Sequence, residues 1–359
     1  MYVYLTVMFL CCILLYVMRN NTNKITPLAF SFGLIWIMVA LQDGWGGDHD
    51  SYVLFFDLFH GLSIKDLLED TTHGEIGFKV FMSIMPSEHF GVIVGMAIWC
   101  FAMAFFFYHF IPQKWWFLAI VFVFIDRSIL MGMIGSYFRM ALANTCLIFA
   151  IYSIWKNKRI FSVGLIFLGA LFHKSILFML PLVFVGQKPL RTKPIGVMVF
   201  FVMFTIFFML FPSSWINFVE NIVMGIDKFD SFEYYFENQD AIQFKGITLI
   251  IVFYWVYLLS TKLCADNLMS KEYLMMYLAL IRIAFDLLPA VGMSTRFFYF
   301  IDIYYFAGMM CLLNRLSKMD VNIYGIVITL LIMFWYTGFR VYSASEFYKQ
   351  HWATYNLIF

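Results

Sequence analysis

Long apolar stretches recur along almost the whole chain, separated by shorter polar segments. The hydrocarbon core of a bilayer is about 30 Å thick, and a helix of about 20 apolar residues spans it. The pattern therefore predicts an all-α, polytopic integral membrane protein that forms a single domain over residues 1–359. We predict membrane-spanning helices near residues 1–18, 27–42, 89–110, 115–130, 136–155, 195–212, 247–263, 273–291, 297–314 and 321–340.

The apolar stretch 160–185 does not fit one spanning helix. As a single helix it would be ~39 Å long, more than the bilayer core needs. The polar pair His173-Lys174 also stands at its centre. We therefore predict a broken pair of short helices, 160–171 and 175–185, because interrupted membrane helices are tolerated where they line a protein cavity. With this pair the chain crosses the membrane about 10 to 12 times.

The basic residues between the predicted spans set the orientation. With the break at 173–174, one side of the membrane receives Arg19, Lys24, Lys114, Lys156, Lys158, Arg159, Lys188, Arg191, Lys193, Lys262, Lys271, Arg315 and Lys318. Short loops rich in Lys and Arg face the cytoplasm. This side is therefore predicted to be cytoplasmic, and both termini are predicted to lie outside the cytoplasm. Without the break, the basic loop at 186–194 and the later basic loops would move to the outer side.

Two long acidic loops, 43–88 and 213–246, fall on the outer side. In the first loop, aromatic residues recur at helical spacing, which predicts a helix lying along the membrane surface. These residues are Tyr52, Phe55, Phe56 and Phe59. The run 76–85 is predicted to be a short re-entrant helix. Because loops of this length are usually functional or disordered, and these are rich in aromatic residues, we expect them to be functional.

Composition supports the membrane assignment and excludes several other classes. Hydrophobic residues make up 63% of the chain and charged residues 13%, which no soluble fold accommodates. The net charge of +2 is uninformative alone, but no basic cluster suggests nucleic-acid binding. The six cysteines lack metal-ligand spacing, and the segment GGDHD lacks the spacing of a calcium loop, so we predict no metal and no cofactor. No Lys or Arg precedes the first apolar run, which predicts a retained span rather than a cleaved signal peptide.

Charged residues inside a membrane are costly and mark candidate functional sites. On the predicted topology, several reach a similar depth near the outer face: Asp48, Asp50, Glu75, Arg139, His173, Arg282, Asp286, Arg296 and Asp302. Some have a structural alternative. Arg282 and Asp286 are spaced i,i+4 and suit a structural ion pair. Asp302 could have no role beyond neutralising a nearby arginine. Lys174 could simply cap the broken helix.

These residue types suit transfer of a group from a diphosphate to a hydroxyl. Guanidinium groups bind phosphate oxygens in a fork, and a departing diphosphate needs two or more cations. Arg139 and Arg296 could supply them, with Arg282 as a further candidate.

A neutral histidine or a carboxylate can deprotonate an attacking hydroxyl. His173 is predicted to be that base or to orient the acceptor. The first-loop carboxylates Asp48, Asp50 and Glu75 are predicted to bind sugar hydroxyls, and one of them could be the base instead. Lipid-linked sugars present both reacting parts.

Five short segments occur in a fixed order along the chain: GGDHDSY (46–52), EIGF (75–78), RMALA from Arg139, LFHKS (171–175) and RFFYF from Arg296. In this order and approximate spacing they resemble the EpsG family, the Wzy-like polymerases of bacterial exopolysaccharide and O-antigen. The resemblance covers most of residues 30–305. It implies a fold akin to the class C glycosyltransferases.

The resemblance also implies a reaction. Such polymerases work in the bacterial cytoplasmic membrane, with an active site facing the periplasm or the cell exterior. They transfer a growing chain from undecaprenyl diphosphate to a hydroxyl of a new lipid-linked repeat unit. The expected partners are lipid-linked oligosaccharide donor and acceptor, membrane lipid and a chain-length regulator. Asp50 and Tyr52 of the first segment are expected to contact sugar.

Two other functions are compatible with the sequence. A membrane O-acyltransferase that modifies surface glycans also uses an embedded histidine, but it needs a path for an acyl donor from the cytoplasm. A flippase or transporter of lipid-linked oligosaccharides would be expected to show an internal repeat, and the sequence shows none.

Overall fold

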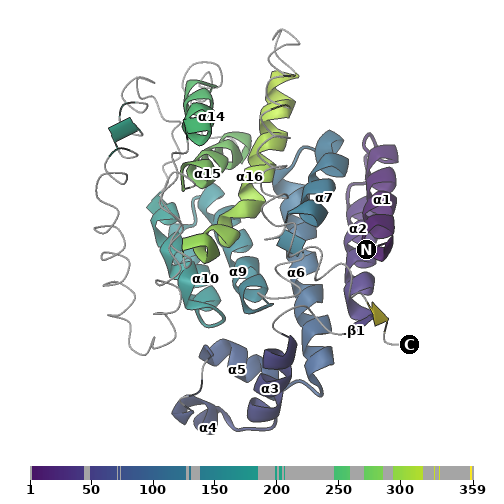
Figure 1. Cartoon of the computed structure of the whole chain (residues 1–359), viewed down its shortest axis with the longest axis vertical. Coiled ribbons are helices and arrows are strands. Elements are labelled where there is room, and N and C mark those ends of the chain that lie inside the picture. The colour runs from purple at the N-terminus through teal and green to yellow at the C-terminus, as the bar shows by residue number, and fades with distance from the viewer. Residues whose placement is uncertain are drawn as a thin grey trace. The chain divides into compact units, whose positions relative to one another are not determined.

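The structure is a computed structural model of the whole chain (Figure 1). It describes residues 2–43, 49–70, 72, 74–126, 129–130, 138–184, 246–258, 271–285 and 294–317, with isolated positions 199, 202–203, 206, 327, 331 and 356–357. The chain divides into two compact units, Met1–Val185 with Leu316–Phe359, and Gly186–Arg315.

The first unit is helical. Its helices are α1 (Tyr2–Val17), α2 (Ile25–Ala40), α3 (His49–Phe59), α4 (Ile64–Glu69), α5 (Ile76–Ser83), α6 (Glu88–Phe110), the 3₁₀ turn η2 (Gln113–Trp115), α7 (Trp116–Ile125), α9 (Phe138–Trp155), α10 (Arg159–Ala170) and the 3₁₀ helix η4 (Lys174–Phe184). The two-residue strands β1 (Gln42–Asp43) and β2 (Asn356–Leu357) pair antiparallel, which the all-α prediction did not include. The helical fold class is confirmed for the rest of the described chain.

The helices of the first unit pack in a continuous series (Figure 1). Helix α1 contacts α7 and α2, α2 contacts α6, α6 contacts α9, and α9 contacts α10 and η4. The α6–α9 contact depends on a glycine, because a Cβ built on Gly95 would overlap the ring of Phe138. Among the described residues, α6 and α9 are long and apolar enough to cross a membrane, and shorter apolar helices of 10–17 residues accompany them.

The break predicted within 160–185 is confirmed. Helix α10 ends at Ala170, and η4 begins at Lys174. The second half differs from the prediction in being a 3₁₀ helix that contains Pro181, a residue that cannot supply the backbone N–H of a regular α-helix. The predicted helix 115–130 also ends early, since α7 stops at Ile125.

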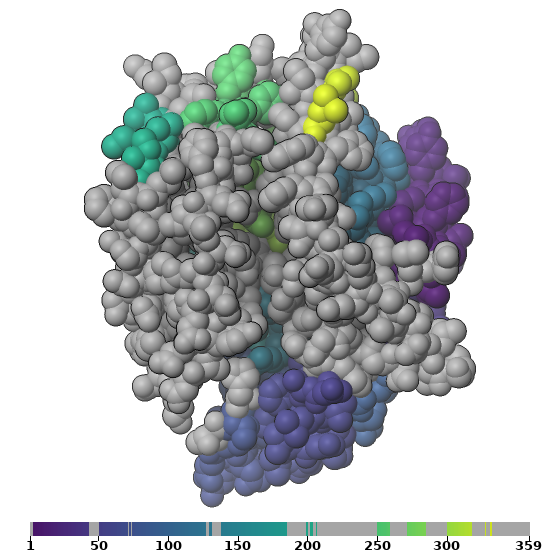
Figure 2. All heavy atoms as spheres, in the orientation of Figure 1, coloured from purple at the N-terminus to yellow at the C-terminus, as the bar shows by residue number. Residues whose placement is uncertain are grey.

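Helices α3, α4 and α5 gather together at one end of α6 (Figure 1), and on the face shown in Figure 2 they form an exposed group. The helices expected near 52–59 and 76–85 are thus confirmed as helices. Helix α4 was not predicted. It begins with a capping box, in which the Ser63 side chain accepts from Asp66 N–H and the Asp66 side chain accepts from Ser63 N–H.

A buried lysine fixes the loop between α4 and α5. Lys79 is 3% exposed, and its Nζ donates to the backbone oxygen of Asp70 at 2.9 Å and to Oδ2 of Asp70 at 2.8 Å. The hydrogen bonds from Lys79 and then from Thr72 lower the pKa of Asp70 to about 2. This network holds the segment that leads into Glu75.

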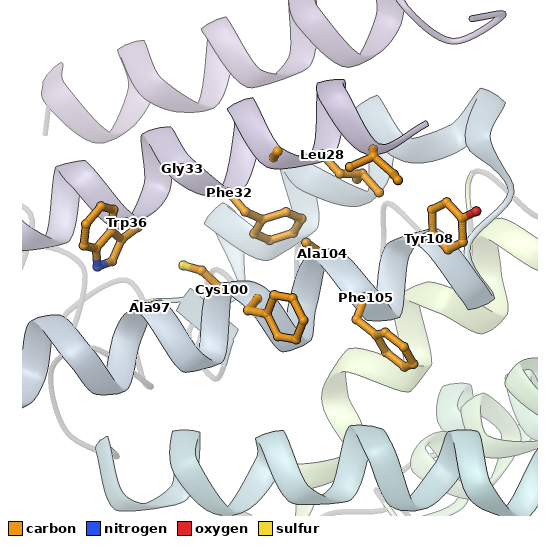
Figure 3. Close-up of a pocket in the computed structure, with 12 residues that line it drawn as sticks. Leu28, Phe32, Gly33, Trp36, Ala97, Cys100, Ala104, Phe105 and Tyr108 are labelled. Carbon is orange, nitrogen blue, oxygen red and sulfur yellow. The ribbon is translucent and has the colours of Figure 1, made fainter. Parts of the chain in front are cut away.

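An apolar groove of about 610 Å³ runs between α2 and α6 (Figure 3). Its walls are Ile25, Leu28, Ala29, Phe32, Gly33, Trp36, Ala97, Cys100, Phe101, Ala104, Phe105 and Tyr108. At one end, the indole N–H of Trp36 donates to the backbone oxygen of Ile93 at 3.0 Å, which ties the two helices together.

The second unit contains α14 (Gly246–Tyr257), α15 (Lys271–Phe285) and α16 (Ser294–Leu316). Helix α14 contacts α15. Glu272 of α15 accepts hydrogen bonds from Asn314 at 2.9 Å and Arg315 at 3.0 Å, both in α16. The span predicted at 297–314 is confirmed as a helix. Those predicted at 247–263 and 273–291 are confirmed as helices over their described parts, up to Tyr257 and Phe285. The spans predicted at 195–212 and 321–340 lie outside the described ranges apart from isolated residues.

Candidate functional site

Glu75 joins three segments of the first unit. It occupies the N-cap position of α5, but its side chain does not cap its own helix. Its Oε2 accepts a hydrogen bond from Nη1 of Arg139 in α9 at 2.9 Å. Its Oε1 accepts from the backbone N–H of Lys174, at the start of η4, at 3.1 Å. The Glu75 and Arg139 side chains are only 12% and 17% exposed, so this ion pair is largely shielded from water.

Arg139 lies against aromatic rings as well as against Glu75. Its guanidinium carbon is 5.8 Å from the ring centre of Phe55 in α3 and 5.7 Å from that of Phe78 in α5. Cations are attracted to the faces of aromatic rings at such distances. The guanidinium of this α9 residue is therefore held in place by groups of two other helices, α3 and α5.

Tyr52 anchors the first turn of α9. Its hydroxyl oxygen accepts a hydrogen bond from the backbone N–H of Phe138 at 3.1 Å, one of the amides that a helix N-terminus leaves unpaired. The Tyr52 ring is 3% exposed and packs edge-on against Phe78 and Phe138. This places Tyr52 directly beside the residue that precedes Arg139. Its predicted contact with sugar stays a prediction.

His173 lies at the break between α10 and η4. Its backbone N–H donates to the Gly169 oxygen at 3.0 Å, and its own oxygen accepts from Ile176 N–H at 3.2 Å. The half-buried ring has its Nδ1 2.5 Å from the hydroxyl oxygen of Ser175. One ring nitrogen is therefore engaged locally by a serine two residues later.

The electrostatics tie His173 to Glu75. Burial raises the pKa of Glu75 and is the largest single influence on it. The charges of Arg139 and His173 and the N–H of Lys174 together outweigh burial, so that the pKa falls below its ordinary value of 4.5. Glu75 is therefore a carboxylate at neutral pH, surrounded by donors and positive charge.

Gly77 allows α5 to dock on the end of α10. The backbone N–H groups of Gly77 and Phe78 both donate to the Leu171 oxygen, at 2.8 and 3.3 Å. A Cβ on Gly77 would lie 2.7 Å from both Cβ and the oxygen of Leu171, closer than side chains pack. The segment EIGF thus supplies a carboxylate, a close backbone contact and a buried aromatic ring.

The other predicted site residues are placed less closely or not described. Asp50 is exposed in the first turn of α3. Asp48 lies outside the described residues, and for Arg296 the structure gives its position in the first turn of α16 but not its side chain. Arg282 is buried and its Nε is hydrogen-bonded to Oδ1 of Asp302, both in the second unit. Asp302 thus neutralises an arginine, which is the structural alternative that the sequence suggested for it.

The sequence alone did not single out several residues of this cluster. Phe55 and Phe78 belong to sequence patterns that do not indicate a contact with Arg139. Ser175 belongs to the segment LFHKS, which does not indicate a hydrogen bond to His173. The backbone N–H of Lys174 carries no sequence signal at all. Within the described part of the chain, no group of three His, Cys, Asp or Glu residues is arranged to hold a metal ion.

Four of the sequence segments contribute described residues to this cluster: Tyr52 of GGDHDSY, the segment EIGF, Arg139 of RMALA, and His173 to Ser175 of LFHKS. The model of the EpsG family matches residues 25–357, nearly the whole chain. The chain belongs to the EpsG family. Membership in the EpsG family indicates a role in polysaccharide synthesis of the polymerase type and, together with the apolar helices, a membrane protein. Searches of curated proteins and of solved structures find no match.

Proposed function

We propose that this EpsG-family protein is a glycosyltransferase that polymerises lipid-linked oligosaccharide repeat units at the outer face of the bacterial cytoplasmic membrane. The observation that carries the proposal is the cluster of Arg139, Glu75 and His173, which unites an anion-binding cation, a carboxylate and a proton-transfer group. Its donor and acceptor are undecaprenyl-diphosphate-linked oligosaccharides.

Arg139 is the proposed ligand of the donor diphosphate. A guanidinium carries five N–H donors in a rigid fork, and Glu75 is hydrogen-bonded to Nη1. The aromatic faces of Phe55 and Phe78 hold its plane, which favours a defined orientation toward a phosphate. A second cation is needed to stabilise a departing diphosphate, and Arg296 is the proposed source.

His173 is the better candidate for the general base. An efficient base has a pKa near the working pH, whereas Glu75 has a lowered pKa and is hydrogen-bonded through both carboxylate oxygens. Glu75 therefore suits the role of orienting Arg139 and contacting a sugar hydroxyl. The roles of Asp48 and Asp50 remain proposals for sugar binding.

The tautomer of His173 decides what its second ring nitrogen, Nε2, can do. If Nδ1 carries the proton and donates to Ser175, then Nε2 can accept a proton from the acceptor hydroxyl. If the Ser175 hydroxyl donates to Nδ1, then Nε2 carries the proton and can only orient the acceptor. The two roles expected for His173 from the sequence therefore correspond to two directions of one hydrogen bond.

The proposed step balances without a metal or redox partner. The acceptor hydroxyl oxygen attacks the anomeric carbon of the donor chain, and its proton passes to His173. The bond between the anomeric carbon and the diphosphate oxygen breaks, and the electron pair leaves on the lipid diphosphate, whose charge Arg139 and Arg296 stabilise. The product is a longer chain on the acceptor lipid.

The membrane arrangement is part of the proposal. We propose that the basic loop at 186–194 lies on the cytoplasmic side and that His173 lies toward the outer face; the break between α10 and η4 and the distribution of Lys and Arg support this arrangement. The chain then crosses the membrane about 10 to 12 times. The apolar groove between α2 and α6 offers a surface for part of the polyprenyl chain.

A gel of surface polysaccharide from a strain lacking the gene tests the function. A polymerase predicts glycans that carry a single repeat unit in place of long chains. Loss of all surface glycan would support a flippase instead. Chains of normal length that lack an acyl group would support an O-acyltransferase.

The role of His173 has its own test in the same strain. His173→Ala should lower polymer formation by ~10²–10⁴-fold if it is the base. Ser175→Ala should lower it by about 10-fold, the equivalent of one hydrogen bond, and Ser175→Thr should restore it. Ser153→Ala is the matched control, because that hydroxyl donates only to the Phe149 backbone oxygen.

A further inference from the structure

The turn between α9 and α10 carries three exposed cations. Lys156, Lys158 and Arg159 follow one another around Asn157, which adopts a left-handed conformation with a φ of 60°. No Asp or Glu occurs between Phe138 and Phe184, and none of the three cations forms an ion pair with a described residue. Among the described residues, no negative charge compensates this patch of positive charge.

Large apolar side chains stand directly beside this charge. Ile160 is 91% exposed and Phe161 is 60% exposed, although both belong to the first turn of α10. A polar solvent does not favour such exposure next to three charges, whereas the boundary between lipid headgroups and acyl chains accommodates both. The pattern places this turn at a membrane surface.

A cavity of about 440 Å³ is lined both by cations of the turn and by the exposed ring of Phe161. Its wall is mainly apolar, and two lysines and a serine are among its polar members. The lining residues are Phe105, Phe149, Tyr152, Ser153, Lys156, Lys158, Phe161 and Leu165. A second hollow of about 620 Å³, lined by residues 157–161, shares Lys158 and Phe161 with it. An apolar slot with cations at its edge matches a molecule that has an apolar chain and an anionic head.

One of these cations is held in position before any ligand binds. Nζ of Lys156 lies 3.9 Å from the ring centre of Trp155 and 5.7 Å from that of Tyr152. Stacking on two rings restricts an otherwise flexible side chain, which lowers the entropy lost when an anion is bound. In addition, the N-cap residue Lys158 gives no side-chain cap to α10, so the amides of the first turn are not satisfied by a cap.

We infer that the α9–α10 turn binds an anionic phospholipid, with the headgroup phosphate between Lys156, Lys158 and Arg159 and one acyl chain along the 440 Å³ cavity. Charge complementarity selects an anionic lipid over a zwitterionic one, and the apolar wall selects a lipid over a free phosphate. The inference depends on the chain lying in a membrane but not on the polymerase reaction. A bound lipid here would fix α9, the helix that carries Arg139, against α10, which leads to His173.

Native mass spectrometry of the full-length protein in detergent tests this site. The protein is mixed with equal amounts of dioleoyl phosphatidylglycerol and dioleoyl phosphatidylcholine, and the retained lipids are counted. The wild-type protein should retain phosphatidylglycerol preferentially. The triple variant Lys156→Gln/Lys158→Gln/Arg159→Gln should lower that preference roughly 100-fold, which corresponds to about 1 kcal/mol for each cation.

A charge-matched variant separates a site from general attraction. Arg19→Gln/Lys24→Gln/Lys65→Gln removes the same charge elsewhere, from a half-buried arginine and two exposed lysines. It should leave the preference unchanged. An equal loss in both triple variants, or no preference in the wild-type protein, would overturn the inference.

Two further measurements test the lipid character of the ligand. Phe161→Gln should weaken retention of both lipids, because it alters the apolar wall and leaves the cations in place. Inorganic phosphate at the concentration of the lipid should not displace phosphatidylglycerol. Displacement by phosphate, or retention unaffected by Phe161→Gln, would show an anion site without an acyl-chain slot and would contradict the assignment. Each result is read on the purified protein and is independent of polymer synthesis.

Discussion

Removing the charge of Glu75 should uncouple three segments of the first unit. Glu75→Gln keeps the shape of the side chain but has one acceptor oxygen where the carboxylate has two. Whichever way the amide turns, either Arg139 or the Lys174 N–H loses its acceptor. The change therefore tests whether this carboxylate organises the site.

The size of the effect follows from burial. Two unit charges ~4 Å apart interact by about 4 kcal/mol at the effective dielectric constant of a partly shielded site. The pair is 12% and 17% exposed, so the value is reduced by the desolvation cost of burying both charges. We expect a coupling of about 2 to 3 kcal/mol, between the values typical of exposed pairs and of buried ones.

A double-mutant cycle measures that coupling. The free energy of unfolding is determined by SDS titration in mixed micelles for wild type, Glu75→Gln, Arg139→Gln and the double variant. The control cycle uses Lys65→Gln and Glu69→Gln, whose atoms are 3.9 Å apart but whose side chains are 82% and 70% exposed. It should show a coupling below about 0.5 kcal/mol. If the effects at Glu75 and Arg139 simply add within about 0.5 kcal/mol, the reasoning is wrong.

The same pair predicts a pH dependence with a definite sign. The pKa of Glu75 is lower in the folded protein than its ordinary value of 4.5. A lowered carboxylate pKa adds stability that is fully present above the unfolded pKa and is lost as the pH falls through the folded pKa. The stability difference between wild type and Glu75→Gln should therefore be constant above about pH 5 and shrink below pH 4.5. A difference that grows as the pH falls would contradict the assignment of the pair.

Three further predictions concern neighbouring features. Gly77→Ala should lower the free energy of unfolding by about 1 to 3 kcal/mol, since its Cβ would meet Leu171, whereas Gly164→Ala, which has nothing within 4 Å of the new Cβ, should not lower it. Arg139→Lys keeps the charge but loses the fork, so polymer synthesis should fall by ~10²–10³-fold, and near wild-type chain length at equal protein level would refute the diphosphate role. A cysteine at Lys193 should resist an impermeant thiol reagent applied to intact cells, whereas one at Ser213 should react, and labelling at Lys193 would overturn the topology.

The broken helix was accessible from the sequence because its signal is local. An apolar run too long for one crossing, with His173 and Lys174 at its centre, already requires an interruption. Helix α4 could also have been predicted from the sequence, because Ser63 and Asp66 have the spacing of a capping box, but the sequence analysis does not include this helix.

The pairings within the site could not be predicted in the same way. Glu75 finds its partners 64 and 99 residues away, and periodicity along the chain carries no information about such contacts. The same limit explains Arg282. The i,i+4 partner Asp286 lies outside the described residues, so that pairing stays a prediction, whereas the hydrogen bond from Arg282 to Asp302 joins α15 to the neighbouring helix α16 and has no signal in the local sequence.

Synthesis of polymer by the purified protein tests the central claim most directly. Lipid-linked repeat units extracted from the deletion strain are supplied to the full-length protein in liposomes, and the products are separated on a gel. We predict a ladder of polymer with the wild-type protein, a loss of at least about 10²-fold with Arg139→Gln or His173→Ala, and an undiminished ladder with Lys65→Gln. No polymer from the wild-type protein, or a full ladder from both site variants, would contradict the account.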